Sequence, residues 1–166
     1  MRHRTEPFWK ELPAILIGII LLILMSPLLV VLGVGLGVKA LVWGPILTSR
    51  FRRTSGRQGK VAVLVYSDSP HWKQYIEERM LPPVRDRVVT LNWSLRSQWK
   101  KSRSLEVKIF EHWGGRREFN PMAIIIPPRG QVRLLRFWPA FMELKHGKPQ
   151  SVESLCQEFH EAIRAA

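Results

Sequence analysis

The most extreme hydrophobic pattern in the chain is an apolar run from residue 13 to residue 38 that contains no formal charge. A helix needs roughly 20 apolar residues to cross the hydrocarbon core of a bilayer, and a helix of a globular protein normally keeps one polar face. The run has no polar face and exceeds the roughly 7–15 apolar residues of a secretory signal peptide. The pattern therefore predicts a retained N-terminal membrane anchor, residues 1–47, with its apolar part at 13–38 or extended to 47.

Pro27 interrupts this run and leaves two geometries open, because proline kinks or breaks a helix. One is a single kinked span and the other is a hairpin that turns at Ser26 and Pro27. The first arm of such a hairpin, 14–25, is short for a crossing, which favours the single span. Lys and Arg are more numerous after the run than before it. The positive-inside rule therefore predicts a cytoplasmic C-terminal domain, and the hairpin predicts the same side. Trp43 and Phe51 are expected as interfacial anchors.

Residues 48–59 form a segment rich in Arg, Ser and Gly, and they predict a basic linker that is mobile unless a surface holds it. The formal net charge of the whole chain is +13. Basic residues next to a membrane attract anionic lipid, so membrane lipid is the first expected partner. The lipid-facing basic flank consists of Arg50, Arg52, Arg53, Arg57 and Lys60.

From residue 60 onward the pattern changes to short apolar runs separated by turns and helical stretches. Brief β-branched runs indicate buried strands, and apolar positions three or four residues apart indicate helices. Strands are predicted at 61–66, 88–93, 105–110, 122–126 and 132–137, and helices at 70–80 and 151–165, the last capped by Ser151. Residues 94–104 are expected as a surface helix or a loop. This order predicts one α/β domain at 60–166.

Cysteine and histidine usage limits the chemistry. Cys156 is the single cysteine, so no intramolecular disulfide can form, and a place on the apolar face of the last helix predicts a small buried residue. No Cys or His pair has metal-ligand spacing. The sequence therefore predicts neither a metal nor a cofactor.

Polar residues follow the first predicted strand. Asp68, Ser69 and His71 could form an acid–base site, but closeness in sequence does not establish the required geometry. Helix capping explains Ser69 and Asp68 more simply. Further along, Phe137, Trp138 and Phe141 are either core packing, which the sequence slightly favours, or a docking patch for a protein partner.

The order of elements resembles the thioredoxin-like fold. Ser69-Pro70-His71-Trp72-Lys73 resembles a Cys-Gly-His-Cys-Lys motif with both cysteines replaced, and Pro121 resembles the cis-proline that opens the third core strand. The resemblance implies a thioredoxin-like mixed sheet flanked by helices, here preceded by a transmembrane helix. It also implies a cis Asn120–Pro121 bond across from the Ser69–Trp72 loop, and a strand that begins at Met122 beside 61–66.

The replaced cysteines determine the predicted function, because thiol chemistry needs a thiolate and a resolving cysteine. The sequence predicts a membrane-anchored, non-redox binding or scaffold module, with no catalytic residues assigned. Its binding residues are Asp68, Ser69, His71, Trp72 and Pro121. One alternative is an enzyme that uses Asp68, Ser69 and His71. The other is an anionic-lipid or nucleic-acid binding module, for which the sequence favours lipid over nucleic acid.

Overall fold

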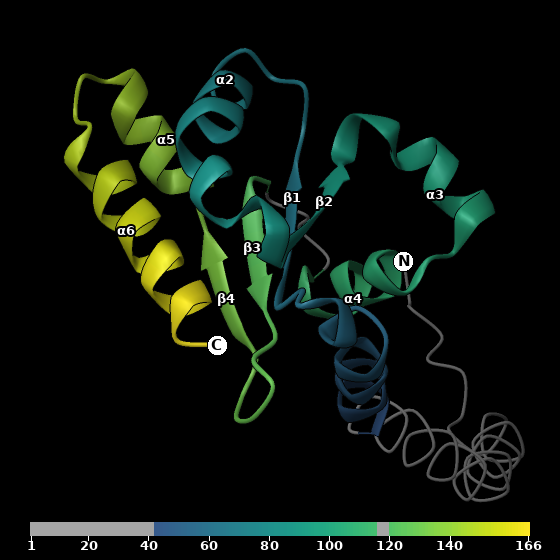
Figure 1. The fold of residues 1–166 in the computed structure, drawn as a ribbon. Coiled ribbons are helices and arrows are strands. Elements are labelled where there is room, and N and C mark those ends of the chain that lie inside the picture. Colours follow the sequence, from purple (N-terminus) through teal and green to yellow (C-terminus); the bar gives the residue numbers. More distant parts are fainter. Residues whose placement is uncertain (1–41, 116–119) are drawn as a thin grey trace, which may run out of the picture. The chain divides into compact units, whose positions relative to one another are not determined.

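The computed structural model describes residues 42–115 and 120–166. Residues Gly44–Ala166 form one compact unit (Figure 1). The predicted anchor at 13–38, with its single-span and hairpin alternatives, lies outside the described residues. Within the described ranges no helix is long and apolar enough to cross a membrane.

A four-stranded mixed sheet with the order β2-β1-β3-β4 lies at the centre of this unit. The strands are β1 (Ala62–Tyr66), β2 (Val88–Asn92), β3 (Met122–Ile125) and β4 (Arg133–Arg136). β1 pairs in parallel with β2 and antiparallel with β3, and β3 pairs antiparallel with β4. The predicted α/β class is therefore confirmed, and so is the central strand that begins at Met122.

β1 is buried along its whole length because helices cover both faces of the sheet. Side chains alternate across a strand, so Leu64 and Tyr66 enter one hydrophobic cluster while Val63 and Val65 enter the other. A strand covered on both faces reads as a continuous apolar run. This explains why its sequence shows no alternation.

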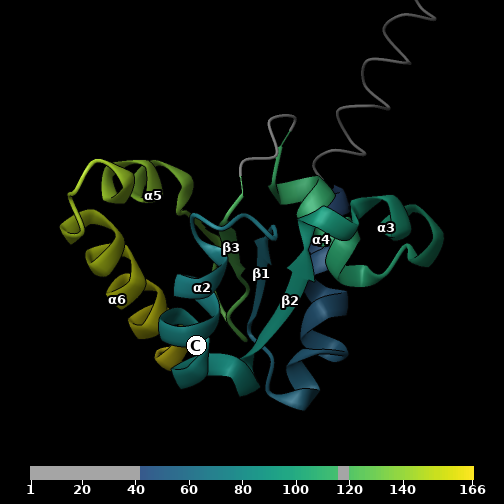
Figure 2. The same cartoon turned by 90° about the horizontal axis from the view of Figure 1, so that it is seen from above.

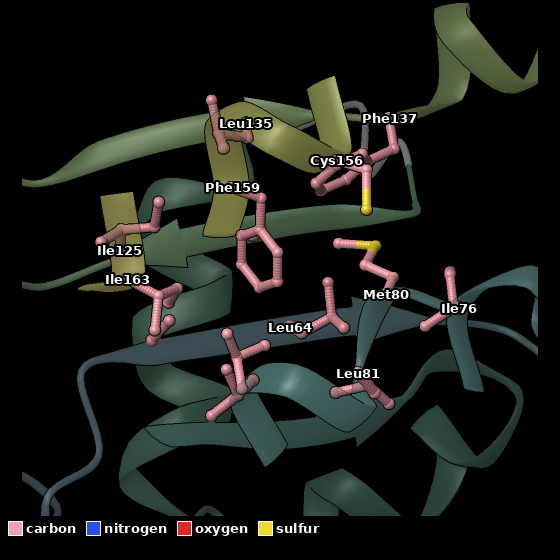
Figure 3. Packing of buried hydrophobic residues seen from close by; sticks show 14 of the residues in the cluster. Leu64, Ile76, Met80, Leu81, Ile125, Leu135, Phe137, Cys156, Phe159 and Ile163 are labelled. Atoms are coloured by element: carbon pink, nitrogen blue, oxygen red, sulfur yellow. The ribbon is translucent and has the colours of Figure 1, made fainter. Parts of the chain in front are cut away.

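The first cluster lies between the sheet and the helices that cover one of its faces, which include the two C-terminal helices (Figures 1 and 2). These elements are α2 (Lys73–Tyr75), the π-helix η3 (Ile76–Met80), the 3-10 helix η4 (Pro82–Arg87), α5 (Trp138–Lys145) and α6 (Gln150–Arg164). Figure 3 shows Phe159 of α6 among Leu64, Met80 and Ile163, with the sulfur of Cys156 directed toward Met80. The predicted place of Cys156 on the apolar face of the last helix is confirmed, but Ser151 is no cap: α6 begins before it, and its hydroxyl bonds Glu143.

The second cluster lies on the opposite face, under a helix at residues 42–53 and α4 (Leu105–Trp113). The prediction of a strand at 105–110 is wrong, because these residues form a helix. Ser104 caps a helix there by accepting the Val107 N–H at 3.3 Å, and Glu106 lies in the first turn. Ile109 and Phe110 both pack into the second cluster, as neighbours on a helix can, whereas successive side chains of a strand point to opposite faces. The preceding segment is helical too, as the 3-10 turn η5 (Trp93–Leu95) and α3 (Arg96–Ser102).

The segment predicted as a linker is folded. Leu47 and Phe51 are fully buried in the second cluster, and Ser55 donates a hydrogen bond to Glu106 at 3.2 Å. The segment ends in the 3-10 helix η2 (Gly56–Gln58). Phe51 is therefore a core residue and no interfacial anchor. Composition misled here, because Leu47 and Phe51, one helical turn apart, are enough to hold this basic helix on the sheet.

Arg52 joins this helix to the β3–β4 hairpin. Its Nε donates to the carbonyl of Pro127 at 2.8 Å and its Nη2 to that of Gly130 at 2.7 Å. The Pro127–Gly130 stretch lies in the connection between β3 and β4. Arg52 therefore acts as a clamp on a turn, where the sequence predicts a residue facing lipid.

Replacing Phe51 by alanine should lower the free energy of unfolding by about 3–5 kcal/mol, because a fully buried aromatic side chain is lost. The matched control is Ile46→Ala in the same helix, where the side chain is exposed and the change should stay within about 0.5 kcal/mol. Denaturant unfolding followed by circular dichroism measures both. Equal, small effects would restore Phe51 to a surface role.

Candidate functional site

The carboxyl ends of β1 and β2 meet at one edge of the sheet, because the two strands are parallel. The loop at residues 67–72 leaves β1 there, and η5 and α3 follow β2 at the same edge. Open α/β sheets bind ligands beyond the carboxyl ends of their strands. This edge is therefore the candidate site, and it contains the predicted residues Asp68, Ser69, His71 and Trp72.

Asp68 ties the two loops together. Its carboxylate accepts hydrogen bonds from Lys73 Nζ at 2.7 Å and from Asn92 Nδ2 at 3.0 Å. Its backbone N–H donates to Ser94 Oγ at 2.9 Å. The Lys73 hydrogen bond, and then the one from Asn92, lower the pKa of the Asp68 carboxyl below its ordinary value. Asp68 therefore acts as an ionised cross-link between the ends of the two strands.

Ser69 and His71 do not join Asp68 in an acid–base relay. The hydroxyl of Ser69 accepts the backbone N–H of His71 at 3.4 Å, and the carbonyl of Ser69 accepts the N–H groups of Trp72 and Lys73. The ring of His71 is exposed and lies beside Trp72 at 6.3 Å. In the described part of the chain no hydrogen bond links that ring to Ser69 or Asp68. The three residues close a turn in which the Ser69 hydroxyl and the Asp68 carboxylate bond other groups.

Trp72 fills the space between the loop and α5. Its indole N–H donates to Ser67 Oγ at 3.2 Å, and its ring centroid lies 6.1 Å from that of Phe141. Trp72 is half-buried against the first cluster. The side chain that replaces the second cysteine of the resembled motif is therefore a packing residue that holds the loop.

Pro121 lies at the same edge of the sheet. The Asn120–Pro121 bond is cis, as the sequence predicts. Met122 pairs with Val65 in the antiparallel register, which places Pro121 beside Tyr66, the residue from which the loop departs. The Pro121 carbonyl accepts the N–H of Phe137 at 2.9 Å. Pro121 and the 67–72 loop are thus neighbours through the register of β1 and β3.

Tyr66 and Glu77 form a polar contact beneath the loop. The Tyr66 hydroxyl donates to the Glu77 carboxylate at 3.1 Å. Burial, followed by the charge and hydrogen bond of Glu77, raises the pKa of Tyr66 to about 12. The residue at the end of β1 therefore stays neutral over the physiological range, and its hydrogen bond to Glu77 joins η3 to the strand.

Cys156 lies away from this edge, on α6. The residue is buried, and burial raises the pKa of the Cys156 thiol, which the Tyr75 hydroxyl partly offsets. His160 Nε2 lies 3.9 Å from its sulfur and 2.8 Å from the carbonyl of Met80. A thiol with a raised pKa is a poor nucleophile at neutral pH. The interpretation of Cys156 as a small core residue is thus supported.

A second feature of this edge was missed by sequence reasoning. Trp93, Trp99 and Phe110 contact one another edge to face, with centroids 5.5–5.7 Å apart, and the guanidinium of Arg96 lies 5.1 Å from the Trp93 ring centroid. These rings border a pocket of about 490 Å³, here called the aromatic pocket, completed by Ser94, Ser97 and Glu111. Treating 105–110 as a strand separated Phe110 from the two tryptophans. Helical spacing after a Ser104 cap was the signal that could have found it.

The remaining predicted residues divide between surface and fold. Arg50, Arg53 and Arg57 of the lipid-facing flank are exposed. Lys60 instead reaches the carbonyls of Arg85 and Val88, at 3.3 and 3.4 Å. The flank is therefore only partly a surface feature.

The aromatic stretch that starts α5 is mostly core. Phe137 and Phe141 are buried in the first cluster, and Trp138 is 38% exposed. The packing interpretation holds for the two phenylalanines. A docking patch made of all three side chains is not present on the surface.

Comparison of the chain with protein-family models, with curated proteins and with solved structures found no match. The geometry defines an α/β domain with a four-stranded mixed sheet, helices on both faces, and a candidate site at the carboxyl edge of its parallel strands.

Both tyrosines should titrate above their ordinary pKa of 10.0 in the folded protein, with Tyr66 near 12. A folded-state pKa above the unfolded value stabilises the fold below about pH 10, and that contribution is lost as the pH rises through about 12. Tyrosinate absorbance in a Tyr75→Phe background isolates Tyr66, with circular dichroism to verify folding. Glu77→Gln should shift the midpoint of the Tyr66 titration to lower pH. A midpoint at the ordinary value in the folded chain would contradict the Tyr66–Glu77 contact.

Proposed function

We propose that the protein is a membrane-anchored, thioredoxin-like module that binds a protein partner at the carboxyl edge of β1 and β2 without redox chemistry. The observation that carries the proposal is the turn at Ser69–Trp72. It stands where the resembled motif has its cysteines, and the described chain holds it by a Trp72–Ser67 hydrogen bond and an Asp68 cross-link.

The order and direction of the strands support the thioredoxin-like assignment. Parallel β1 and β2 are joined through helices, β3 follows a cis proline and runs antiparallel beside β1, and β4 returns as a hairpin before the last helices. This is the arrangement that the resemblance implies for residues 60–166. Residues 44–59 add a helix that covers the second face.

The chemistry of the loop supports binding over catalysis. The Asp68 carboxylate is occupied by Lys73 and Asn92, and the buried Cys156 belongs to another part of the fold. Pro70 and His71 are exposed at the tip of the loop, while the groups behind them are fixed. Exposed side chains on a loop that a rigid scaffold positions are typical of a recognition surface.

The anchor and the location rest on the sequence. The uncharged run at 13–38 supports attachment to a membrane, and the basic residues that follow it support a cytoplasmic position for the domain. The exposed Arg50, Arg53 and Arg57 would lie where anionic lipid can attract them. In this proposal the anchor keeps the 67–72 loop close to membrane-bound partners.

Site-specific photo-crosslinking tests the binding face in the full-length chain. A photoreactive residue in place of His71 should give a discrete protein adduct in cells. The same residue in place of Lys145, which is also exposed but lies at the end of α5, should give none. The proposal fails if neither position gives an adduct, or if both give the same pattern.

A pair of engineered cysteines tests the thioredoxin-like turn separately. The Ser69 carbonyl accepts the Trp72 N–H, and a turn closed in this way brings its end Cα atoms within about 7 Å, close to the range of about 4.4–6.8 Å that a disulfide spans. Ser69→Cys with Trp72→Cys, in a Cys156→Ala background, should therefore form an intramolecular disulfide under oxidised glutathione. Mass spectrometry and thiol counting measure it.

The matched control for this pair is Ser69→Cys with His71→Cys, where the second position is one residue closer and points to solvent. It should keep two free thiols under the same conditions. Two free thiols in the Ser69/Trp72 pair, with circular dichroism showing a folded protein, would contradict the turn.

A further inference from the structure

Two neighbouring pockets share the side chain of Trp99. One is the aromatic pocket, and the other, of about 670 Å³, is lined by Asn92, Leu95, Gln98, Lys101 and Ser102 in addition to Trp99. Trp99 is half-buried and packs against Trp93 and Phe110. A planar group can therefore contact an aromatic surface in either of two adjacent hollows along α3.

The segment that forms these pockets is strongly basic. Residues 93–103 contain Arg96, Lys100, Lys101 and Arg103 and no acidic residue. Arg96, Lys101 and Arg103 are exposed. Among the described residues, no ion pair or hydrogen bond engages the side chains of Lys101 and Arg103, whereas Arg52 and Lys60 are used by the fold. Within the described chain, Arg96 lies over the Trp93 ring, whereas the charges of Lys101 and Arg103 have no partner in the fold.

Arg103 carries a positive charge at a position whose backbone conformation favours glycine. It ends α3 in the left-handed conformation, with φ of 40°. This conformation is unfavourable for a non-glycine residue, and glycine is the usual residue at a helix end of this kind. The backbone conformation therefore does not account for an arginine at position 103, which points to a role for its side chain.

The ligand that these features fit is anionic and planar. A cationic ligand is disfavoured, because Arg96 already lies over Trp93 and the three rings contact one another directly. A bilayer surface is disfavoured, because a helix that enters the interface needs an apolar face, whereas the exposed positions of α3 include Ser97, Gln98 and Lys101.

The edge of the aromatic pocket supplies polar groups suited to a base. Glu111 offers a carboxylate that can accept a hydrogen bond from an exocyclic amino group. Ser97 offers a hydroxyl that can donate or accept. Aromatic side chains that stack bases, next to basic residues that follow a phosphate backbone, are the elements of single-strand recognition.

We propose that the pockets on either side of Trp99 bind single-stranded nucleic acid, with bases against Trp93 and Trp99 and phosphates along Arg96, Lys101 and Arg103. The spread of basic residues along the whole helix favours a polymer over a single nucleotide. This site adjoins the 67–72 loop through Asn92 and Ser94, but it does not depend on the thioredoxin-like assignment.

The test uses the full-length chain in a non-ionic detergent and a fluorescein-labelled single-stranded oligocytidylate of about 12 nucleotides. Fluorescence anisotropy should show saturable binding that weakens as salt is added. Trp99→Leu, which keeps an apolar side chain but removes the stacking surface, should weaken binding roughly tenfold. Lys101→Ser should reduce the slope of log K against log salt by about 0.7.

Arg103→Gly distinguishes binding from folding. Glycine suits the positive φ at this position, so the variant should be at least as stable as the wild type and yet bind more weakly. Trp138→Leu and Lys145→Ser are the matched controls, because both residues are exposed on α5. They should leave the affinity unchanged.

Several results would overturn the proposal. One is the absence of binding at low salt. Another is an equal loss in Lys101→Ser and Lys145→Ser with none in Trp99→Leu, which would mean general attraction to a basic protein. A third is cytidine monophosphate competing as well as the oligonucleotide at equal concentration. The last is binding to phosphatidylserine vesicles that Trp99→Leu weakens while oligonucleotide binding is unaffected.

Discussion

The burial of β1 on both faces is the constraint on which the rest of the domain depends. All five residues from Ala62 to Tyr66 are buried, and full burial of a valine or leucine side chain contributes about 1.5–3 kcal/mol. Since neighbouring side chains point to opposite faces, neither face can be left to solvent without losing half of that contribution. The helix at 42–53 and α4 on one side, and α5 and α6 on the other, are therefore both required.

This constraint also positions the candidate site. A strand with both faces covered and a neighbour on each edge can present polar groups only at its ends. Since β2 runs parallel to β1, both chains leave the sheet at the same edge, and Asp68 meets Asn92 and Ser94 there. Ser94 also borders the aromatic pocket. The 67–72 loop and the pocket are therefore built on one rigid support, although they differ in chemistry.

The sequence predicted the elements whose signal lies within one short run. Strands β1 to β4 were found within a residue or two, because buried runs and turn residues are local features, and the cis bond at Pro121 followed from the resemblance. The missed features depend on contacts between distant segments. Local sequence indicates a linker at Phe51, because its burial depends on the distant strands of the sheet. It indicates a surface charge at Arg52, because the carbonyls that this side chain bonds lie 75 residues or more along the chain. Alternation over six residues could not distinguish α4 from a strand.

The basic residues of this chain are of two kinds, which a count of charges does not distinguish. Arg52 and Lys60 donate to backbone carbonyls at the ends of a turn and of a helix. Lys101 and Arg103 have no such acceptors within the described chain, and Arg103 retains a backbone conformation that suits glycine. A high net charge is therefore a weak indication of function until each cation is assigned to fold or to surface. Among the described side chains, the basic residues of α3 are not used by the fold in the way that Arg52 and Lys60 are. They lie beside Trp93 and Trp99, so that a ligand can contact positive charge and an aromatic surface together.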